Sequence, residues 1–250
     1  MSEGKKEILL GDCLELMKDI PNGSIDMILC DLPYGTTACK WDSIIPFELL
    51  WKEYERIIKD NGAIVLTASQ PFTSSLVMSN VKLFKYEWIW NKAKAANFPQ
   101  VKYAPLKIHE DILVFSKEKH NYYPQMVQKG KERKKGGYFV KGEVAVMAGA
   151  PAKTNNIYYP KTILEYSIAD NKGAGLHPTQ KSVELFEYLI KTYTLENEIV
   201  LDNTAGSGTT AIACLNTNRQ FIVMEKEQKY YNIILERVNK FYTNKQQTLF

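Results

Sequence analysis

The feature that most constrains the fold is a repeated alternation between short apolar runs, rich in β-branched residues, and longer amphipathic stretches. This alternation is typical of a sheet of parallel strands that is covered by helices. The predicted strands are residues 7–10, 25–30, 62–68, 85–92, 110–117, 198–202 and 221–225. The predicted helices are residues 13–20, 46–59, a segment starting near 70, 179–193, 209–215 and 230–241. The sequence therefore predicts an α/β fold with a doubly wound, mostly parallel sheet of seven strands.

The middle of the chain interrupts this alternation. Residues 125–176 are irregular and carry nine Lys or Arg against four Asp or Glu, although the net charge of the whole chain is only +4. We therefore expect one domain formed by residues 1–124 and 177–250, with an insertion at 125–176. The densest basic run is KGKERKK at 129–135. Such a run is either a solvated loop or a surface that contacts phosphates, and the run alone leaves both open.

The sequence lacks features that several classes of protein require. The sequence has no uncharged apolar run of the length needed to span a bilayer and no apolar signal-peptide core at its start, so we expect a cytoplasmic protein. Cys13, Cys30, Cys39 and Cys214 form no CxxC pair, which favours buried free thiols over a zinc site or disulfides. His109 lacks HExxH spacing, so no metal site is expected.

The strongest ligand signal is the segment VLDNTAGSGTTA at 200–211, between a predicted strand and a predicted helix. Gly206 and Gly208 allow a sharp turn and a close approach of a ligand to the backbone. A P-loop is excluded because no Gly-Lys-Ser/Thr follows, and Ala211 replaces the third glycine of the dinucleotide pattern. Glu225 ends the next strand, where a carboxylate can accept hydrogen bonds from two ribose hydroxyls. The loop therefore fits an adenosine-containing ligand, with a purely structural turn as the alternative.

A second signal is the turn DLPYG at 31–35, directly after a predicted strand. Open α/β sheets bind ligands at the carboxyl ends of their strands, but the same letters also describe an ordinary reverse turn. In the chemical interpretation the turn binds an amino group on a flat heterocycle. Asp31 and a neighbouring carbonyl would accept its N–H groups, and Tyr34 would stack on the ring. Acceptors placed there would stabilise the positive charge that develops as the nitrogen is alkylated.

Together these segments resemble the DNA amino-methyltransferases, which methylate the exocyclic amine of adenine or cytosine. DLPYG resembles the family's Asp-Pro-Pro-Tyr motif, AGSGTT at 205–210 its S-adenosylmethionine loop, and HPTQK at 177–181 a third segment. The catalytic motif precedes the cofactor loop, which is the circularly permuted β-class order. The resemblance spans residues 7–124 and 177–240. It implies a Rossmann-like methyltransferase sheet. It also implies that the insertion at 125–176 recognises the DNA target.

The resemblance also implies roles for individual residues. The catalytic set is Asp31, Leu32, Pro33 and Tyr34. The cofactor-binding set is Asp12, Cys13, Asp31, Lys181, Asp202, Asn203, Thr204, Ala205, Gly206, Ser207, Gly208, Thr209 and Glu225. Asp12 would bind the adenine amine of the cofactor, and the alternative is that it only caps a helix. Lys181 would neutralise the methionine carboxylate, and the alternative is that it lies at a solvated helix start. The DNA-contacting set is Lys129, Lys131, Arg133, Lys134, Lys135 and Tyr138, with Asn155 and Asn156 as further candidates for reading bases.

Two positions depart from the family pattern: Leu32 replaces the first proline, and Asn203-Thr204 stands where the family often has Pro-Phe. Because the other motif residues are present, we predict an active enzyme without a metal. It would transfer a methyl group from S-adenosylmethionine to N6 of an adenine flipped out of duplex DNA. The alternatives are cytosine N4 methylation, methylation of RNA or of a protein amide, and a catalytically silent DNA-binding subunit. The resemblance leaves open whether the chain forms a homodimer and whether it works beside a cognate restriction endonuclease.

Overall fold

The computed structural model describes residues 5–35, 42–95, 97–135, 140–141, 146–147, 153–167 and 181–247 of the 250-residue chain. The chain divides into two compact units. The larger unit runs to Tyr123 and resumes at Thr162, and the smaller unit is formed by residues 124–161.

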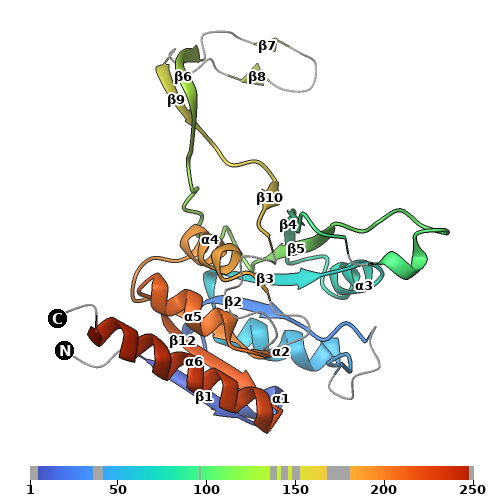
Figure 1. Ribbon diagram of the computed structural model, residues 1–250, viewed down its shortest axis with the longest axis vertical. Helices are drawn as coiled ribbons and strands as arrows, with labels where there is room; N and C mark the ends of the chain where they lie inside the picture. Colours follow the sequence, from blue (N-terminus) through green and yellow to red (C-terminus); the bar gives the residue numbers. More distant parts are fainter. Residues whose placement is uncertain are drawn as a thin grey trace. The chain divides into compact units, whose positions relative to one another are not determined.

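The larger unit is built on an eight-stranded sheet, counted over the described residues, with the order β1-β12-β11-β2-β3-β5-β4-β10 (Figure 1). Its strands are β1 (Lys6–Leu10), β2 (Ile25–Asp31), β3 (Ile58–Ala68), β4 (Phe84–Asn91), β5 (His109–Phe115), β10 (Ile163–Glu165), β11 (Ile199–Asp202) and β12 (Gln220–Glu225). Strand β5 is antiparallel to both of its neighbours, and the other neighbouring strands pair in parallel. The predicted doubly wound, mostly parallel α/β sheet is therefore confirmed.

Helices cover both faces of this sheet, as Figure 1 shows. They are α1 (Cys13–Leu16), α2 (Phe47–Ile57), α3 (Phe72–Ser79), α4 (Val183–Tyr193), α5 (Thr209–Asn216) and α6 (Gln228–Gln247), with short 3₁₀ turns η1 (Met17–Asp19) and η2 (Phe98–Gln100). Successive side chains of a strand point to opposite faces. In β2, Met27 and Leu29 belong to the core formed with α4, α5 and α6, whereas Ile28 and Cys30 belong to the core formed with α1, α2 and α3. Burial on both faces explains why the sequence of β2 is mostly apolar.

The sheet has one strand more than predicted, because the chain returns to it earlier than expected. Ile163–Glu165 pair in parallel with Ile89–Asn91 at the sheet edge, inside the stretch predicted to be an insertion up to residue 176. A strand of three residues is too short to show an alternating pattern. Trp88 and Trp90 of β4 are buried in the core.

The smaller unit contains β structure where the sequence predicted an irregular segment. Strand β6 (Val127–Lys135) pairs in antiparallel fashion with β9 (Lys153–Tyr158), and β7 (Val140–Lys141) pairs with β8 (Val146–Met147). The β6–β9 register shifts between Gln128 and Arg133, and Gly130 in this stretch has a φ of +53°. This irregularity breaks the alternation by which a strand is recognised in a sequence.

Two further predictions concerned the cysteines and membrane-spanning helices. Cys13, Cys30 and Cys214 are buried free thiols, as predicted, and Cys39 lies outside the described residues. Within the described part of the chain, no helix is both long and apolar enough to cross a membrane.

Candidate functional site

A cavity of about 550 Å³ lies at the carboxyl ends of β1, β2, β11 and β12 in the larger unit. The helix after β2 and the helix after β11 cover opposite faces of the sheet, which leaves a crevice between these two neighbouring strands. The volume falls in the range of sites for small organic ligands. All the predicted catalytic residues and all the predicted cofactor residues except Gly208 line this cavity. The structure thus brings together two motifs that are about 170 residues apart.

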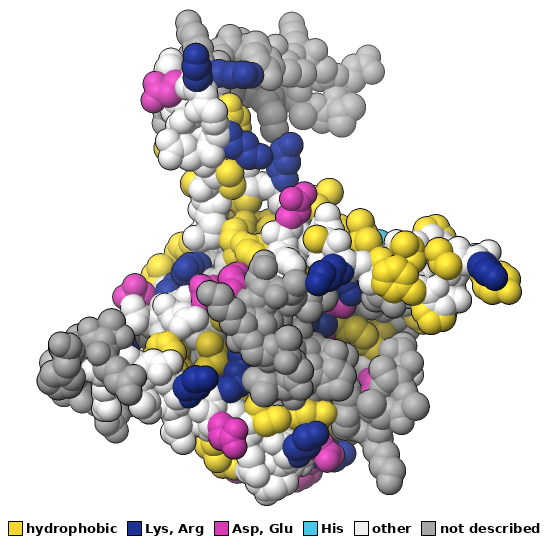
Figure 2. Space-filling view, in the orientation of Figure 1, with side chains coloured by type: hydrophobic (Ala, Val, Ile, Leu, Met, Phe, Trp, Pro, Cys, Tyr) yellow, Lys and Arg dark blue, Asp and Glu magenta, His cyan; other side chains and the backbone are white. Residues whose placement is uncertain are grey.

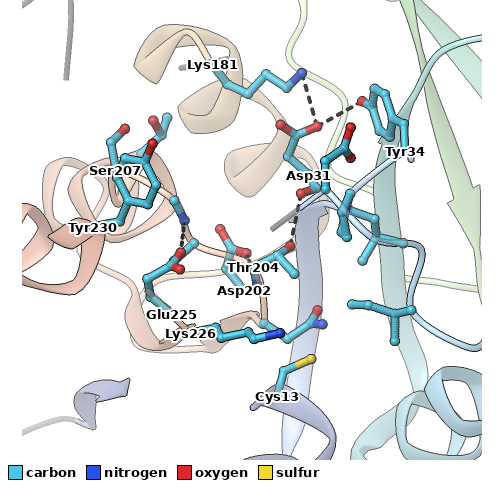
Figure 3. Close-up of a pocket in the computed structure, with 18 of the residues that line it drawn as sticks. Cys13, Asp31, Tyr34, Lys181, Asp202, Thr204, Ser207, Glu225, Lys226 and Tyr230 are labelled. Carbon is cyan, nitrogen blue, oxygen red and sulfur yellow. Dashed lines mark hydrogen bonds and ion pairs between the residues drawn. The ribbon is translucent and has the colours of Figure 1, made fainter. Parts of the chain in front are cut away.

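Asp31 is held in the cavity wall by several contacts (Figure 3). Its Oδ1 accepts hydrogen bonds from the Tyr34 hydroxyl (2.8 Å) and the Thr67 hydroxyl, and it lies 3.1 Å from Lys181 Nζ. Its backbone carbonyl accepts a hydrogen bond of 3.0 Å from Thr204 Oγ1. Thr204 therefore ties the turn after β2 to the glycine loop after β11, although its residue type departs from the family pattern.

Tyr34 places a ring and a hydroxyl beside Asp31. The ring stacks on Phe72, with a centroid distance of 5.1 Å and an interplanar angle of 27°. A flat ligand that stacks on Tyr34 must therefore use the other face of the ring. Burial raises the pKa of the Tyr34 hydroxyl well above its usual value, so the hydroxyl stays protonated and donates to Asp31.

A row of ion pairs with charges of alternating sign extends from Asp31 through Lys181 and Glu110 to Lys92. Lys181 lies 2.7 Å from Glu110, and Glu110 lies 2.9 Å from Lys92. Burial alone would raise the pKa of Glu110, but the two ammonium groups outweigh it and hold the pKa at about 2. Burial likewise opposes the charge on Lys181, and Asp31 with Glu110 keeps its pKa well above the usual value. In the structure Lys181 therefore pairs with two carboxylates of the chain, Asp31 and Glu110.

The acidic residues Asp12 and Glu225, which follow β1 and end β12, already hold backbone groups. Asp12 caps α1, where its Oδ1 accepts a hydrogen bond of 2.9 Å from the Leu14 N–H, so the alternative role predicted for it is present. Glu225 accepts a 2.8 Å hydrogen bond from the Gly206 N–H with one oxygen and another from the Glu227 N–H with the other. These contacts fix the glycine loop, and each carboxylate oxygen retains a lone pair for a ligand hydroxyl.

Asp202 and Asn203 form the buried floor of the glycine loop. Asp202 accepts hydrogen bonds from the Thr204 N–H (3.0 Å) and the Thr210 hydroxyl, and burial raises its pKa to about 7. Asn203 Oδ1 accepts a hydrogen bond of 2.6 Å from the Tyr54 hydroxyl. Its Nδ2 is buried in the cavity wall without a hydrogen-bond partner among the described residues. An unsatisfied buried donor is costly, so this atom suits an acceptor on a bound ligand.

Sequence reasoning missed Thr67, Lys92 and Glu110. A usable signal existed for the last two, because Lys92 directly follows β4 and Glu110 lies at the start of β5. In a hairpin such residues meet at one edge of the sheet. Lys226, just before α6, and Tyr230, in the first turn of α6, also line the cavity.

The predicted DNA-contacting residues belong to the smaller unit. Lys129, Lys131 and Arg133 are exposed on β6. Lys134 and Lys135 continue that strand, but their side chains lie outside the described part of the structure. Tyr138 and residues 177–180 lie outside it entirely. Asn155 and Asn156 are on β9, where Asn156 Nδ2 donates to the Gly130 carbonyl.

Comparison with known proteins gives a consistent result. A family model for DNA methylases of the N6/N4 type matches residues 25–236. The chain is 28% identical to the type II methyltransferase M.HinfI of Haemophilus influenzae, over 95% of this chain and 69% of that protein. It is 27% identical to the DNA adenine methyltransferase YhdJ of Escherichia coli strain K12, over 94% and 83%.

Solved structures agree with this family. The M1.HpyAVI–SAM complex superposes with a TM-score of 0.62 at 27% identity, over 92% of this chain and 98% of that one. The PvuII DNA methyltransferase, described as cytosine-N4-specific, superposes with a TM-score of 0.66 at 16% identity, over 92% and 85%. At this lower identity the second likeness is evidence for the fold alone.

Proposed function

Because the chain belongs to the N6/N4 DNA methylase family, we propose that it transfers the methyl group of S-adenosylmethionine to the N6 amino group of adenine in duplex DNA. The observation that carries this proposal is that Asp31–Tyr34 and the glycine loop line the same cavity. The hydrogen bond from Thr204 to Asp31 joins these two segments. When bound, S-adenosylmethionine supplies an electrophilic methyl group on a sulfonium.

The chain's own residues can prepare the target nitrogen. Flipping the base costs a few kcal/mol, of which stacking on Tyr34 would return about 1–3 kcal/mol. Asp31 accepts an N–H of the target amine, and its negative charge stabilises the positive charge that develops on that nitrogen. Lys181 and Thr67 keep the carboxylate in place for this task.

The cofactor is proposed to occupy the side of the cavity formed by the strand ends of β1, β11 and β12. Glu225 would accept from ribose hydroxyls, Asp12 from the adenine amine, and the orphan Asn203 Nδ2 would donate to a cofactor acceptor. Since Lys181 already has two carboxylate partners, we assign it to holding Asp31 rather than to the methionine carboxylate.

The choice of base rests on the motif and on one relative, because the fold is shared with a structure described as cytosine-N4-specific. Asp31 at the first motif position and the name of the adenine methyltransferase YhdJ both support adenine. The test is to incubate the protein with isotope-labelled S-adenosylmethionine and unmethylated genomic DNA, then identify the labelled nucleoside by mass spectrometry. N6-methyldeoxyadenosine is expected. Labelled N4-methyldeoxycytidine would replace the base assignment, and no label despite calorimetric cofactor binding would indicate a silent subunit.

We also propose that the smaller unit contacts DNA phosphates through Lys129, Lys131 and Arg133. Each contact made contributes about −0.9 to the slope of log affinity against log salt, so changing all three to Ala should flatten the slope by up to about 2.7. Target choice should persist, because phosphate contacts carry no sequence information. The control is alanine at three exposed lysines of the larger unit, Lys18, Lys52 and Lys240. Equal slopes for wild type and the β6 variant would show that the basic run is only a solvated surface.

A further inference from the structure

The loop between β4 and β5 exposes large apolar side chains in the larger unit. It is described over residues 92–95 and 97–108. Phe98 is 62% exposed, Val101 55% and Tyr103 90%. Figure 2 shows hydrophobic side chains gathered on the projection that this loop forms in Figure 1. Apolar side chains gathered on an exposed projection are typical of a surface that contacts a partner.

The charge of this loop is entirely positive. Residues 92–108 contain four lysines and no acidic residue. Lys94 and Lys102 are exposed, whereas Lys92 pairs with Glu110 and Lys107 donates to the Ser69 hydroxyl. Two exposed cations beside exposed aromatic rings are the combination that binds nucleic acid, with phosphates on the ammonium groups and bases on the rings.

The tip of the loop is organised by its own hydrogen bonds. Asn97 Nδ2 donates to the Pro105 carbonyl (3.0 Å), and Asn97 Oδ1 accepts from the Lys107 N–H (2.6 Å). Inside this closure the Tyr103 N–H donates to the Gln100 carbonyl at 2.8 Å. A tip fixed in this way presents its side chains at a small entropic cost on binding.

Both ends of the loop reach the cavity that contains Asp31. Lys92 and Glu110 line that cavity, and the Lys92 N–H donates to the Ile108 carbonyl (2.8 Å), which closes the base of the loop. Because β4 and β2 point in the same direction, the loop leaves the sheet at the edge where β2 delivers Asp31. A duplex that presents a base to Asp31 therefore passes close to this loop.

We propose that the β4–β5 loop is a DNA-contacting element in its own right, in which Lys94 and Lys102 hold phosphates and Phe98 and Tyr103 pack against the bases around the extruded target. This inference rests on the proposed function. Extrusion leaves a gap in the base stack, and aromatic side chains can fill such a gap. A two-fold contact between copies of the chain through this loop would bring like charges together, so the charge favours DNA.

The experiment measures DNA binding by the full chain with two double variants. Changing Lys94 and Lys102 to Ala should lower the salt slope by up to about 1.8. Changing Phe98 and Tyr103 to Ala should weaken binding about tenfold or more, since one lost stacking contact already has this effect. Matched controls are Met78→Ala, an exposed apolar residue of α3 (73% exposed), and the double change of Lys52 and Lys240 to Ala. Both controls should bind DNA as the wild type does.

Wild-type affinity and slope in both loop variants would overturn the inference. A change from dimer to monomer in sedimentation velocity for the Phe98/Tyr103 variant, with an unaltered salt slope, would assign the loop to a second copy of the chain instead. Cofactor affinity measured by calorimetry shows whether each variant keeps its fold. Binding is read without turnover, so a wild type that binds DNA but transfers no methyl group would refute the proposed function and leave this test standing.

Discussion

Asp31 receives its hydrogen bonds and its ion pair from three different segments, so its position is set before any base arrives. Replacing Asp31 with Ala removes the one carboxylate proposed to act on the target nitrogen. We expect turnover to fall by about 10² or more while cofactor affinity stays within a few-fold. Single-turnover kinetics and calorimetry check the two parts separately. A variant that keeps more than about a tenth of wild-type turnover would contradict the role of Asp31.

Glu110 is expected to matter for the stability of the fold more than for direct contact with the substrate. It lies between two ammonium groups whose side chains are only 7% and 9% exposed. Glu110→Gln leaves these charges without their shared partner, and breaking a buried pair in this way costs about 3–5 kcal/mol of unfolding free energy. Urea denaturation measures the loss.

The control for this prediction is Glu15→Gln, which removes the carboxylate of the exposed Lys18–Glu15 pair. Exposed pairs contribute little, so its denaturation curve should match that of the wild type. A Glu110→Gln variant that is as stable as this control would show that Lys92 and Lys181 find other partners.

At the scale of elements, the seven predicted strands were recognised because each is a short apolar run or, as in β4, an alternation of apolar and polar residues. Strand β10 was missed because three residues show no pattern, and β6 because its register shift interrupts the alternation. The same reasoning found the residues that follow β2 and β11, since position after a strand is visible in the sequence. It missed the Lys92–Glu110 contact, which depends on the pairing of Asn91 with His109 across a long loop.

The glycine loop shows how structure changes the meaning of a predicted residue. Gly208 has a φ of +79°, and a Cβ placed there would lie 3.0 Å from the Ile234 side chain of α6. It does not line the cavity, so its role is to let α6 pack against the start of α5. The structure therefore gives Gly208 a packing reason, besides the close approach of a ligand that the sequence predicted for this loop.

Gly208→Ala should lower the free energy of unfolding by more than Gly23→Ala does. A side chain at either position carries the cost of an unfavourable backbone region, about 1–3 kcal/mol, but only the side chain at residue 208 also meets Ile234. Cofactor affinity should fall as well, because the start of α5 must shift. Gly23→Ala is the matched control, since Gly23 has a φ of +59° with nothing within 4 Å of its Cβ position. Thermal unfolding and calorimetry compare the two variants. An equal loss of stability and of affinity in both would leave Ile234 without a role.

At the scale of the whole molecule, the buried carboxylates give opposite pH dependences to global stability. Glu110 has a pKa lowered to about 2, so its contribution is present above about pH 4.5 and is lost as the pH falls through about 2. Asp202 has a pKa raised from 3.8 to about 7 by burial, so the folded chain binds its proton more tightly than the unfolded chain does. Between pH 3.8 and about pH 7, the two pKa values of Asp202, the stability that this residue contributes therefore declines as the pH rises.

The last prediction isolates this second contribution with Asp202→Asn, which keeps an acceptor oxygen but cannot ionise. The difference in unfolding free energy, wild type minus variant, should decrease from about pH 4 to about pH 7 by up to about 1.4 kcal/mol per pH unit, and become constant above. Chemical denaturation of both proteins at intervals across this range, without cofactor, gives the two curves. Parallel curves would mean that Asp202 stays ionised when buried, and the Thr204 and Thr210 hydrogen bonds would then be strong enough to hold a charge in the floor of the cavity.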